Sequence, residues 1–396
     1  MFYKKIFPYL LLLPFIVYSM RGGFYTSGGI LSRAMVVVVL LMGFYFMIYC
    51  LIHYYHKLGS AVKCHLFLIV FATCSWIVSD KEIYGSYVGS VHTIDFMKNF
   101  LYPNLSFYIF YFLFKKYSIS INMVLIWALL IAIGTYYNML YERNLRLSLL
   151  TWDAQSVQIA MGYTFAMFIP YAYFIRKPLL RIGLAFLLFL ITVSSAKRGA
   201  MVLGAMQLIM CYYKTFMIDN KRHRYAMILM GVFIGFIAIF LAWHYISQND
   251  FVMNRLSKME EGDTSNRSTM YSLMLNYCLS LSDIFKFLFG GGVIYTVKII
   301  GDYAHNDWFE SFINFGIIYT IVYLSFYIHL FVRMKKVCTD FKFIIASVIL
   351  SLLFKSFLSM GIYSMDMFVS FMLLAYVFAF DYAKQNVCLR NYKLSK

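Results

Sequence analysis

Charged residues are scarce in this chain. They make up 13% of its 396 residues, against about a quarter in an ordinary soluble domain. Only 17 residues are acidic, whereas 62% are hydrophobic and the mean hydropathy is +0.72. Water cannot be the solvent for most of the surface of such a protein. The composition therefore excludes a soluble globular enzyme and a disordered chain, and it indicates an integral membrane protein.

Several signatures of soluble enzymes and secreted domains are also absent. The seven cysteines are scattered, which excludes a disulfide-stapled domain, and no spacing of Cys and His matches a metal site. The run Gly290-Gly291-Gly292 lacks the Lys that follows a phosphate-binding loop. No nucleophile-elbow or zinc-protease motif occurs. We therefore expect neither a metal nor a cofactor.

The chain is rich in apolar segments that are long enough, or nearly so, to cross a bilayer as helices. Three of them carry no charged residue, at 34–52, 119–137 and 225–243. Weaker candidates lie at 6–20, 62–79, 96–114, 156–175, 179–195, 199–217, 308–332, 343–360 and 361–380. The sequence thus predicts an all-α, polytopic membrane protein, with about twelve transmembrane helices in one membrane domain over residues 1–396.

The basic residues predict how these helices are oriented. With the N-terminus in the cytoplasm and alternating spans, the cytoplasmic segments hold 21 of the 35 basic residues but only 3 of the 17 acidic ones. This is the asymmetry that the positive-inside rule requires. Both termini are therefore expected in the cytoplasm, and the one long loop, at 247–305, on the external side. The net charge of +18 reflects these clusters, so we expect no nucleic-acid partner.

Two cations stand in a short external turn, where the same rule disfavours them. Lys197 and Arg198 join two predicted spans, with Gly199 directly behind them. Basic residues at a membrane surface commonly extend their side chains to the lipid headgroups, which is the ordinary explanation. Because both cations lie on the external side, where the rule disfavours them, a functional explanation is equally favoured.

The long external loop carries two further basic candidates. Arg255 lies in its first part, and Arg267 opens an amphipathic helix. The apolar stripe of this helix recurs at helical spacing, at Met270, Met274, Tyr277, Cys278 and Leu281. A cation in the first turn opposes the helix dipole, so either a partner or plain solvation must account for Arg267.

A polar group directly precedes the predicted span 308–332. Asn306 or Asp307 suits the N-cap, and Asp307 and Glu310 suit the first turn, so a structural role is favoured for both acids. His305 has no capping role. It is either a polar surface residue or a general base, because an imidazole is largely neutral at physiological pH. Further on, Lys355 and Asp366 are expected to pair with each other.

Several of these segments form an ordered pattern along the second half of the chain. They are 195–200 (Ser-Ala-Lys-Arg-Gly-Ala), Arg267 shortly before Met270-Tyr271, Phe289-Gly290-Gly291-Gly292, His305-Asn306 and Gly316-Ile317-Ile318. Together they resemble the signature of the O-antigen polymerase and O-antigen ligase superfamily, over about the second half of the chain. The family usually has Ser-Arg-Gly where this chain has Ala-Lys-Arg-Gly, so Lys197 can share the role of Arg198. The usual Gly-x-Gly is Gly290-Gly291-Gly292 here.

The resemblance implies a metal-independent glycosyltransferase of the bacterial inner membrane, with its active site facing the periplasm. Its donor would be a glycan on undecaprenyl diphosphate, and its reaction the polymerisation of O-antigen, capsular or exopolysaccharide repeat units. The implied catalytic residues are His305, Arg198 and Arg267, and the implied substrate-binding residues are Lys197, Arg255 and Asn306. A chain-length regulator or other polysaccharide-assembly proteins would be further partners, besides the lipid bilayer.

Two alternatives remain open. A ligase would use the same donor and motifs but transfer the glycan to lipid A core or another terminal acceptor. A composition typical of AT-rich coding favours the polymerase, because such coding is common in acquired polysaccharide clusters. A polysaccharide transporter or flippase fits the number of helices equally well. However, transporters concentrate ionisable residues at mid-membrane, whereas the polar candidates of this chain lie on the external side, which favours the enzyme.

Overall fold

The computed structural model describes residues 2–20, 29–149, 161–195, 197–219 and 267–380, with a few isolated residues between 225 and 247. The predicted span 225–243 falls almost wholly outside these residues. Arg255 and the first part of the long loop lie outside them as well.

This part of the chain is helical apart from one hairpin, which confirms the all-α prediction. The elements are α1 (Phe2–Met20), α2 (Gly29–Tyr54), η1 (Tyr55–Lys57), α3 (Ser60–Val78), β1 (Glu82–Gly85), β2 (Gly89–His92), α4 (Thr93–Tyr117), α5 (Ile121–Leu149), α6 (Gly162–Phe168), η3 (Ile169–Phe174), α7 (Pro178–Ser194), α8 (Arg198–Tyr213), η4 (Lys214–Asp219), α11 (Arg267–Ser280), α12 (Ile284–Phe289), α13 (Tyr295–Ile300), α14 (Asp307–Lys336), α15 (Thr339–Leu358), η6 (Met365–Met367) and α16 (Phe368–Ala379).

Six helices of the described chain are long and apolar enough to cross a membrane. They are Gly29–Lys57, Ser60–Val78, Ile121–Glu142, Arg198–Asp219, Asp307–Lys336 and Thr339–Leu358. Shorter apolar helices cover Phe7–Met20, Pro178–Ser194 and Met365–Ala379. These helices support the membrane-protein class, while the count of about twelve spans stays a prediction.

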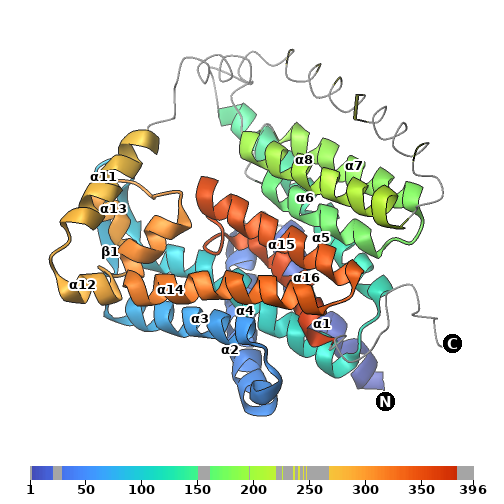
Figure 1. Ribbon diagram of the computed structural model, residues 1–396, viewed down its shortest axis with the longest axis horizontal. Helices are drawn as coiled ribbons and strands as arrows, with labels where there is room; N and C mark the ends of the chain where they lie inside the picture. Colours follow the sequence, from blue (N-terminus) through green and yellow to red (C-terminus); the bar gives the residue numbers. More distant parts are fainter. Residues whose placement is uncertain are drawn as a thin grey trace.

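The core of the bundle lies between α4 and α16, which pack against each other in its middle (Figure 1). Residues 100–114 of α4 and 368–377 of α16 are all buried. On the outside, α2 exposes an apolar stripe at helical spacing: Val37, Leu41, Tyr45, Ile48 and Ile52. An apolar face inside and another outside are expected of a helix that is surrounded by both protein and lipid.

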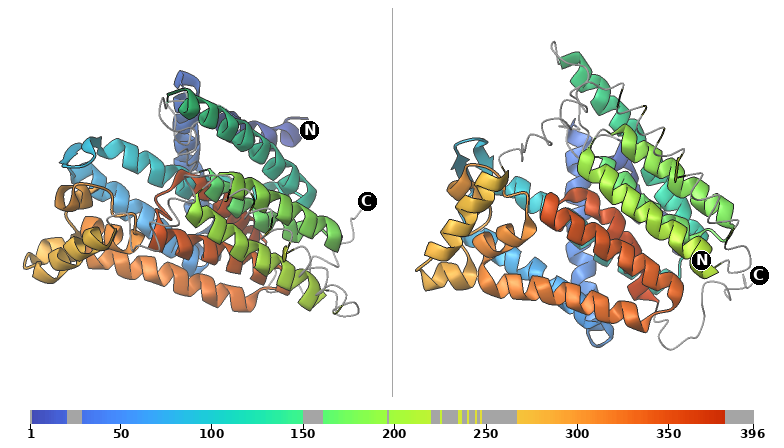
Figure 2. Two further views of the ribbon diagram at one scale, coloured as in Figure 1. Left: turned by 90° about the horizontal axis from the view of Figure 1, so that it is seen from above. Right: turned by 45° about the horizontal axis from the view of Figure 1, so that its top comes forward.

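One end of the bundle carries the elements of the long loop. There α11, α12 and α13 gather with the hairpin β1–β2, at the left of Figure 1 and in both views of Figure 2. The hairpin is antiparallel, with Glu82 opposite His92 and Gly85 opposite Gly89. Its turn is attached to the end of α13, because the carbonyl of Gly301 accepts hydrogen bonds from the backbone amides of the turn.

Helix α14 differs from the continuous span predicted for 308–332, because it is broken at Gly316. The φ of 79° and ψ of −178° at this residue belong to a region that is open to glycine almost alone. The two halves fold towards each other, so that the Tyr323 hydroxyl donates a hydrogen bond to Asp307 Oδ2 at 3.0 Å. In a straight helix these two residues, 16 apart, would be about 24 Å apart.

The break is where the long loop attaches to the bundle. The amides of Gly291 and Gly292 donate to the carbonyls of Ile313 and Asn314, at 2.9 and 3.0 Å. A Cβ on Gly290 would overlap the backbone of Asn314, and a Cβ on Gly316 would overlap the backbone of Leu288. Glycine is required on both sides because two backbones meet without room for a side chain.

We therefore expect Gly316→Ala to destabilise the protein by about 2 kcal/mol or more, through backbone strain and overpacking together. Thermal unfolding of the purified protein in detergent would measure this loss. Gly183→Ala is the matched control, since a Cβ there meets nothing within 4 Å. An unfolding midpoint for Gly316→Ala equal to that of the wild type would contradict the steric argument.

Candidate functional site

The beginnings of α6, α8 and α11 and the end of α15 meet around one side chain, Tyr163. Gly199 of α8 has no side chain, and the Tyr163 hydroxyl fills the space that its Cβ would need. The Tyr163 hydroxyl is also hydrogen-bonded to Ser359, and the charges of Arg267 and Asp366 act on it. Residues that are remote in sequence thus surround a single hydroxyl.

Arg267, the first residue of α11, has a partner at the end of α15. One of its guanidinium nitrogens donates to the carbonyl of Leu358 at 3.0 Å. The last carbonyls of a helix carry partial negative charge, so they compensate a cation that its own helix dipole disfavours. One turn further along α11, the Tyr271 hydroxyl donates to the carbonyl of Phe357 at 3.3 Å. These two bonds fix the start of α11 against α15.

His305 lies in the loop before α14 and has a positive φ of 49°. The residues on both sides of it are held firmly. Before it, the amide of Ala304 donates to Glu310 Oε1 at 2.8 Å. After it, Asn306 caps α14, since its Oδ1 accepts from the amides of Trp308 and Phe309. These hydrogen bonds hold the neighbours of His305 on both sides.

The two acids that follow His305 lie in the first turn of α14, as the sequence predicts, but their hydrogen bonds reach other elements. Both are fully buried. Glu310 also accepts hydrogen bonds from Thr296 and Asn314, at 2.8 and 2.6 Å, and so joins α13 to α14. Asp307 accepts the backbone amides of Gly361 and Ile362, at 2.9 to 3.0 Å. It thereby fixes the turn between α15 and η6.

The electrostatic environment keeps the His305 imidazole neutral. Burial lowers its pKa below the ordinary 6.5, and the positive charges of Arg267 and Lys197 lower this pKa further. Asp302 acts in the opposite direction on the same pKa. The start of α8 and the start of α11 thus each place a cation near one uncharged imidazole.

A buried ion pair lies beside Tyr163. Lys355 Nζ is 2.6 Å from Asp366 Oδ1, and both side chains are 1% exposed. The Lys355 ammonium also donates to the Ser364 hydroxyl at 3.0 Å and lies 5.0 Å from the centre of the Tyr163 ring. The pairing expected from the sequence is confirmed. It joins the end of α15 to η6.

We expect Lys355→Met alone to cost about 3–5 kcal/mol, because it leaves Asp366 as an uncompensated buried carboxylate. The double variant Lys355→Met/Asp366→Leu should recover most of that loss, since it removes both charges together. Thermal unfolding of the two variants beside the wild type measures the difference. Equal destabilisation by the single and the double variant would show that packing, rather than charge, dominates there.

Only some of the site residues predicted from the sequence come together in the structure. Lys197 and Arg267 both act on His305. Arg198 is the first residue of α8, next to the Gly199 that contacts Tyr163. The side-chain oxygen of Asn306 is engaged in capping α14, and Arg255 lies outside the described residues. The roles of these residues in binding or catalysis stay predictions.

Tyr163 is the residue that sequence reasoning missed. It is one of 35 tyrosines, and a tyrosine near the end of a span is ordinary in a membrane protein. The only local signals are the two glycines, Gly162 beside it and Gly199 on α8. Glycines in apolar helices permit close helix packing. They do not indicate which side chain will occupy the space.

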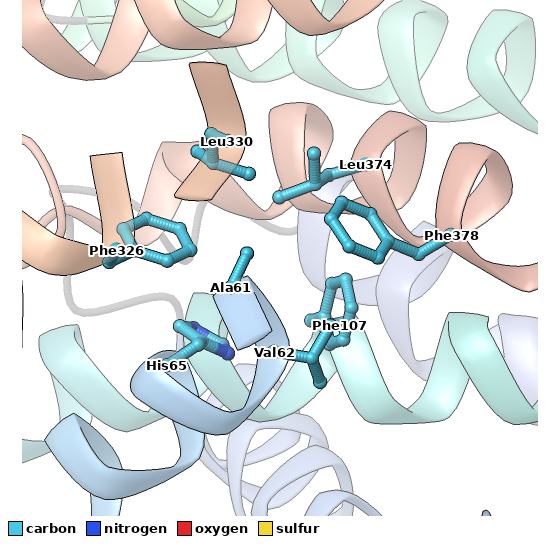
Figure 3. Close-up of a pocket in the computed structure, with 8 residues that line it drawn as sticks. All are labelled: Ala61, Val62, His65, Phe107, Phe326, Leu330, Leu374 and Phe378. Carbon is cyan, nitrogen blue, oxygen red and sulfur yellow. The ribbon is translucent and has the colours of Figure 1, made fainter. Parts of the chain in front are cut away.

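A small apolar cavity, too narrow to hold a water molecule, lies elsewhere in the bundle (Figure 3). Its lining comes from the first turns of α3 and from α4, α14 and α16: Ala61, Val62, His65, Phe107, Phe326, Leu330, Leu374 and Phe378. The imidazole of His65 is hydrogen-bonded to Asn104 Oδ1 at 2.7 Å, so it is a satisfied core residue. No charged side chain lines this cavity, and it does not include His305.

The part of the chain that is described contains no group of three His, Cys, Asp or Glu residues that could hold a metal ion. No protein-family model matches the chain, and no curated protein matches it. The class of protein that the fold and composition define is a helical membrane protein. Its function has to be inferred from the residues around His305 and Tyr163.

Proposed function

We propose that the chain is a membrane glycosyltransferase. It transfers a glycan from an undecaprenyl-diphosphate-linked donor to an acceptor sugar, as a polymerase of O-antigen, capsular or exopolysaccharide repeat units. The observation that carries the proposal is electrostatic: the positive charges of Lys197 and Arg267 both act on the His305 imidazole and, with its burial, lower its pKa. A base without charge beside fixed positive charges suits the transfer of a sugar from an anionic leaving group.

In the proposed reaction His305 acts as the base and the cations stabilise the leaving group. His305 accepts the proton of the acceptor hydroxyl, and the oxygen of that hydroxyl forms a bond to the anomeric carbon of the donor. The bond from that carbon to the diphosphate oxygen breaks, and its electron pair stays with the diphosphate. Arg267 and Arg198, with Lys197, stabilise the negative charge that develops there. Arginine suits this role because its planar fork binds phosphate oxygens in pairs.

A lipid-linked donor would present its diphosphate at the membrane surface. His305 lies in the loop between α13 and α14, at the end of the bundle that holds the loop helices, and we propose that the diphosphate of the donor meets the cations there, at the membrane surface. On the charge-based orientation, this end faces the periplasm and both termini are cytoplasmic. We place the protein in the bacterial inner membrane accordingly.

Reconstituted protein with a purified lipid-linked repeat unit tests the proposal. Growth of the glycan on its lipid carrier supports a polymerase. Transfer to added lipid A core, without such growth, would assign the protein as a ligase. Movement of the labelled repeat unit across the membrane, without any new glycosidic bond, would assign it as a flippase and refute the enzyme.

The lowered pKa of His305 predicts how the reaction depends on pH. The base acts only when neutral, so kcat/KM falls as the pH drops through the pKa of the free enzyme. Lys197→Gln removes one cation that lowers this pKa. The pKa then rises, and the acidic limb of the profile moves to higher pH. Lys298→Gln, in α13, is the control that should leave the limb in place. An unmoved limb in Lys197→Gln would separate Lys197 from the base.

A further inference from the structure

Helix α12 presents an apolar surface that no described part of the chain covers. Ile284 is 60% exposed and Phe285 72% exposed, with more exposed apolar side chains close by in sequence at Leu279, Phe287 and Phe289. The helix lies at the outer edge of the loop end, beside the part of α14 that contains Gly316 (Figure 1). Large apolar side chains grouped in this way mark an interaction surface.

The position of α12 along the bundle is fixed by its attachment to α14. Directly after α12, the amides of Gly291 and Gly292 bond to Ile313 and Asn314, next to the break at Gly316. Beyond the break, residues 317–336 form a helix about 30 Å long, which is the thickness of the hydrocarbon core. This half exposes Ile321, Leu324 and Ile328 to its surroundings. If it spans the core, the break lies at the boundary of the hydrocarbon.

The polar residues of α12 are those of a helix at that boundary. Asp283 caps its N-terminus, accepting from the amides of Phe285 and Lys286. The Lys286 side chain is 43% exposed and lies 3.8 Å from the same aspartate. The Lys286 ammonium also lies 5.7 Å from the centre of the Tyr295 ring, so the one cation and the one anion of α12 stay together at the edge of its apolar surface. An exposed apolar surface with a compensated charge pair at its edge matches one partner, the interface of a phospholipid layer.

We propose that α12 is an interfacial helix that inserts Ile284 and Phe285 into the leaflet on the side of the candidate site. Phe287 of α12 packs on Phe312 of α14, with ring centroids 5.8 Å apart, so we expect the lipid that surrounds α14 to reach α12 as well. This proposal rests on the membrane class and the fold, and it holds whichever reaction the protein performs.

Photocrosslinking of the full-length protein in vesicles tests the insertion. The photoreactive residue p-benzoyl-phenylalanine replaces Phe285, and the vesicles contain phosphatidylcholine and phosphatidylglycerol with tritiated acyl chains. Leu324, on the exposed face of α14, is the positive control, and the fully buried Phe315 is the negative control. We expect the label at position 285 to equal that at 324 and to exceed the background at 315.

Two results would overturn the proposal. A crosslink from position 285 to a second copy of the chain, visible as a covalent dimer, would show that α12 mediates association. Background labelling at 285, with strong labelling at 324, would show that α12 lies in water. A separate readout uses Phe285→Trp, whose added fluorescence should be quenched by lipids brominated near the headgroup more than by aqueous iodide. The reverse order of quenching would also refute the insertion.

Discussion

Replacing His305 by alanine should abolish most glycosyl transfer without removing the donor from its site. The loss of a general base lowers a rate by about 100- to 10,000-fold. Donor binding should persist, because the contacts with the diphosphate belong to the cations of α8 and α11. Single-turnover transfer and equilibrium binding of a labelled lipid-linked donor, on the same reconstituted protein, measure the two effects separately.

The control for this variant is His92→Ala, since His92 is an exposed histidine of the hairpin at the same end of the bundle. It should transfer glycan at the wild-type rate. If His305→Ala, present at a normal level, also kept that rate, His305 would be a polar surface residue before a helix. If it lost donor binding as well, the loop rather than the base would be the cause.

Two features near the candidate site can be predicted from the sequence. Two opposite charges in apolar surroundings have to pair, which is why Lys355 and Asp366 could be joined without a structure. The helix cap could be narrowed to Asn306 or Asp307, because both precede a long apolar run, and the structure shows that Asn306 is the cap. The cap follows from the local sequence, and the ion pair follows from the apolar surroundings of the two charges.

The break in α14 could not be predicted in the same way. Gly316 lies in an apolar run that reads as one continuous span, and isolated glycines are common in membrane helices. What bends the helix there is the backbone of the distant Gly290–Gly292 run, which bonds to it. The environment of Tyr163 has a similar origin. Its neighbours come from four different elements, and only the folded bundle brings them together.

Arg267→Ala should lower glycosyl transfer by about 100- to 1,000-fold, the usual cost of losing one group that stabilises a developing negative charge. Arg267→Lys should restore little. A lysine ammonium lacks the planar fork, so it cannot bond to the Leu358 carbonyl and bind a diphosphate in pairs at once. Arg198→Ala should cause a similar loss, and the double variant less than the sum of the two, if both arginines bind one diphosphate.

The anchoring of α11 to α15 has to be separated from this effect, because Arg267 contributes to both. Tyr271→Phe removes the neighbouring bond from α11 to α15 and leaves the charge of Arg267 in place, so it should transfer glycan at nearly the wild-type rate. The pKa of His305 offers a second distinction. Arg267 lowers it, so the residual activity of Arg267→Ala should have its acidic limb at higher pH, whereas that of Tyr271→Phe should not move. If Tyr271→Phe lost as much activity as Arg267→Ala, with neither limb displaced, Arg267 would serve to hold α11 on α15 and the diphosphate would have to be bound elsewhere.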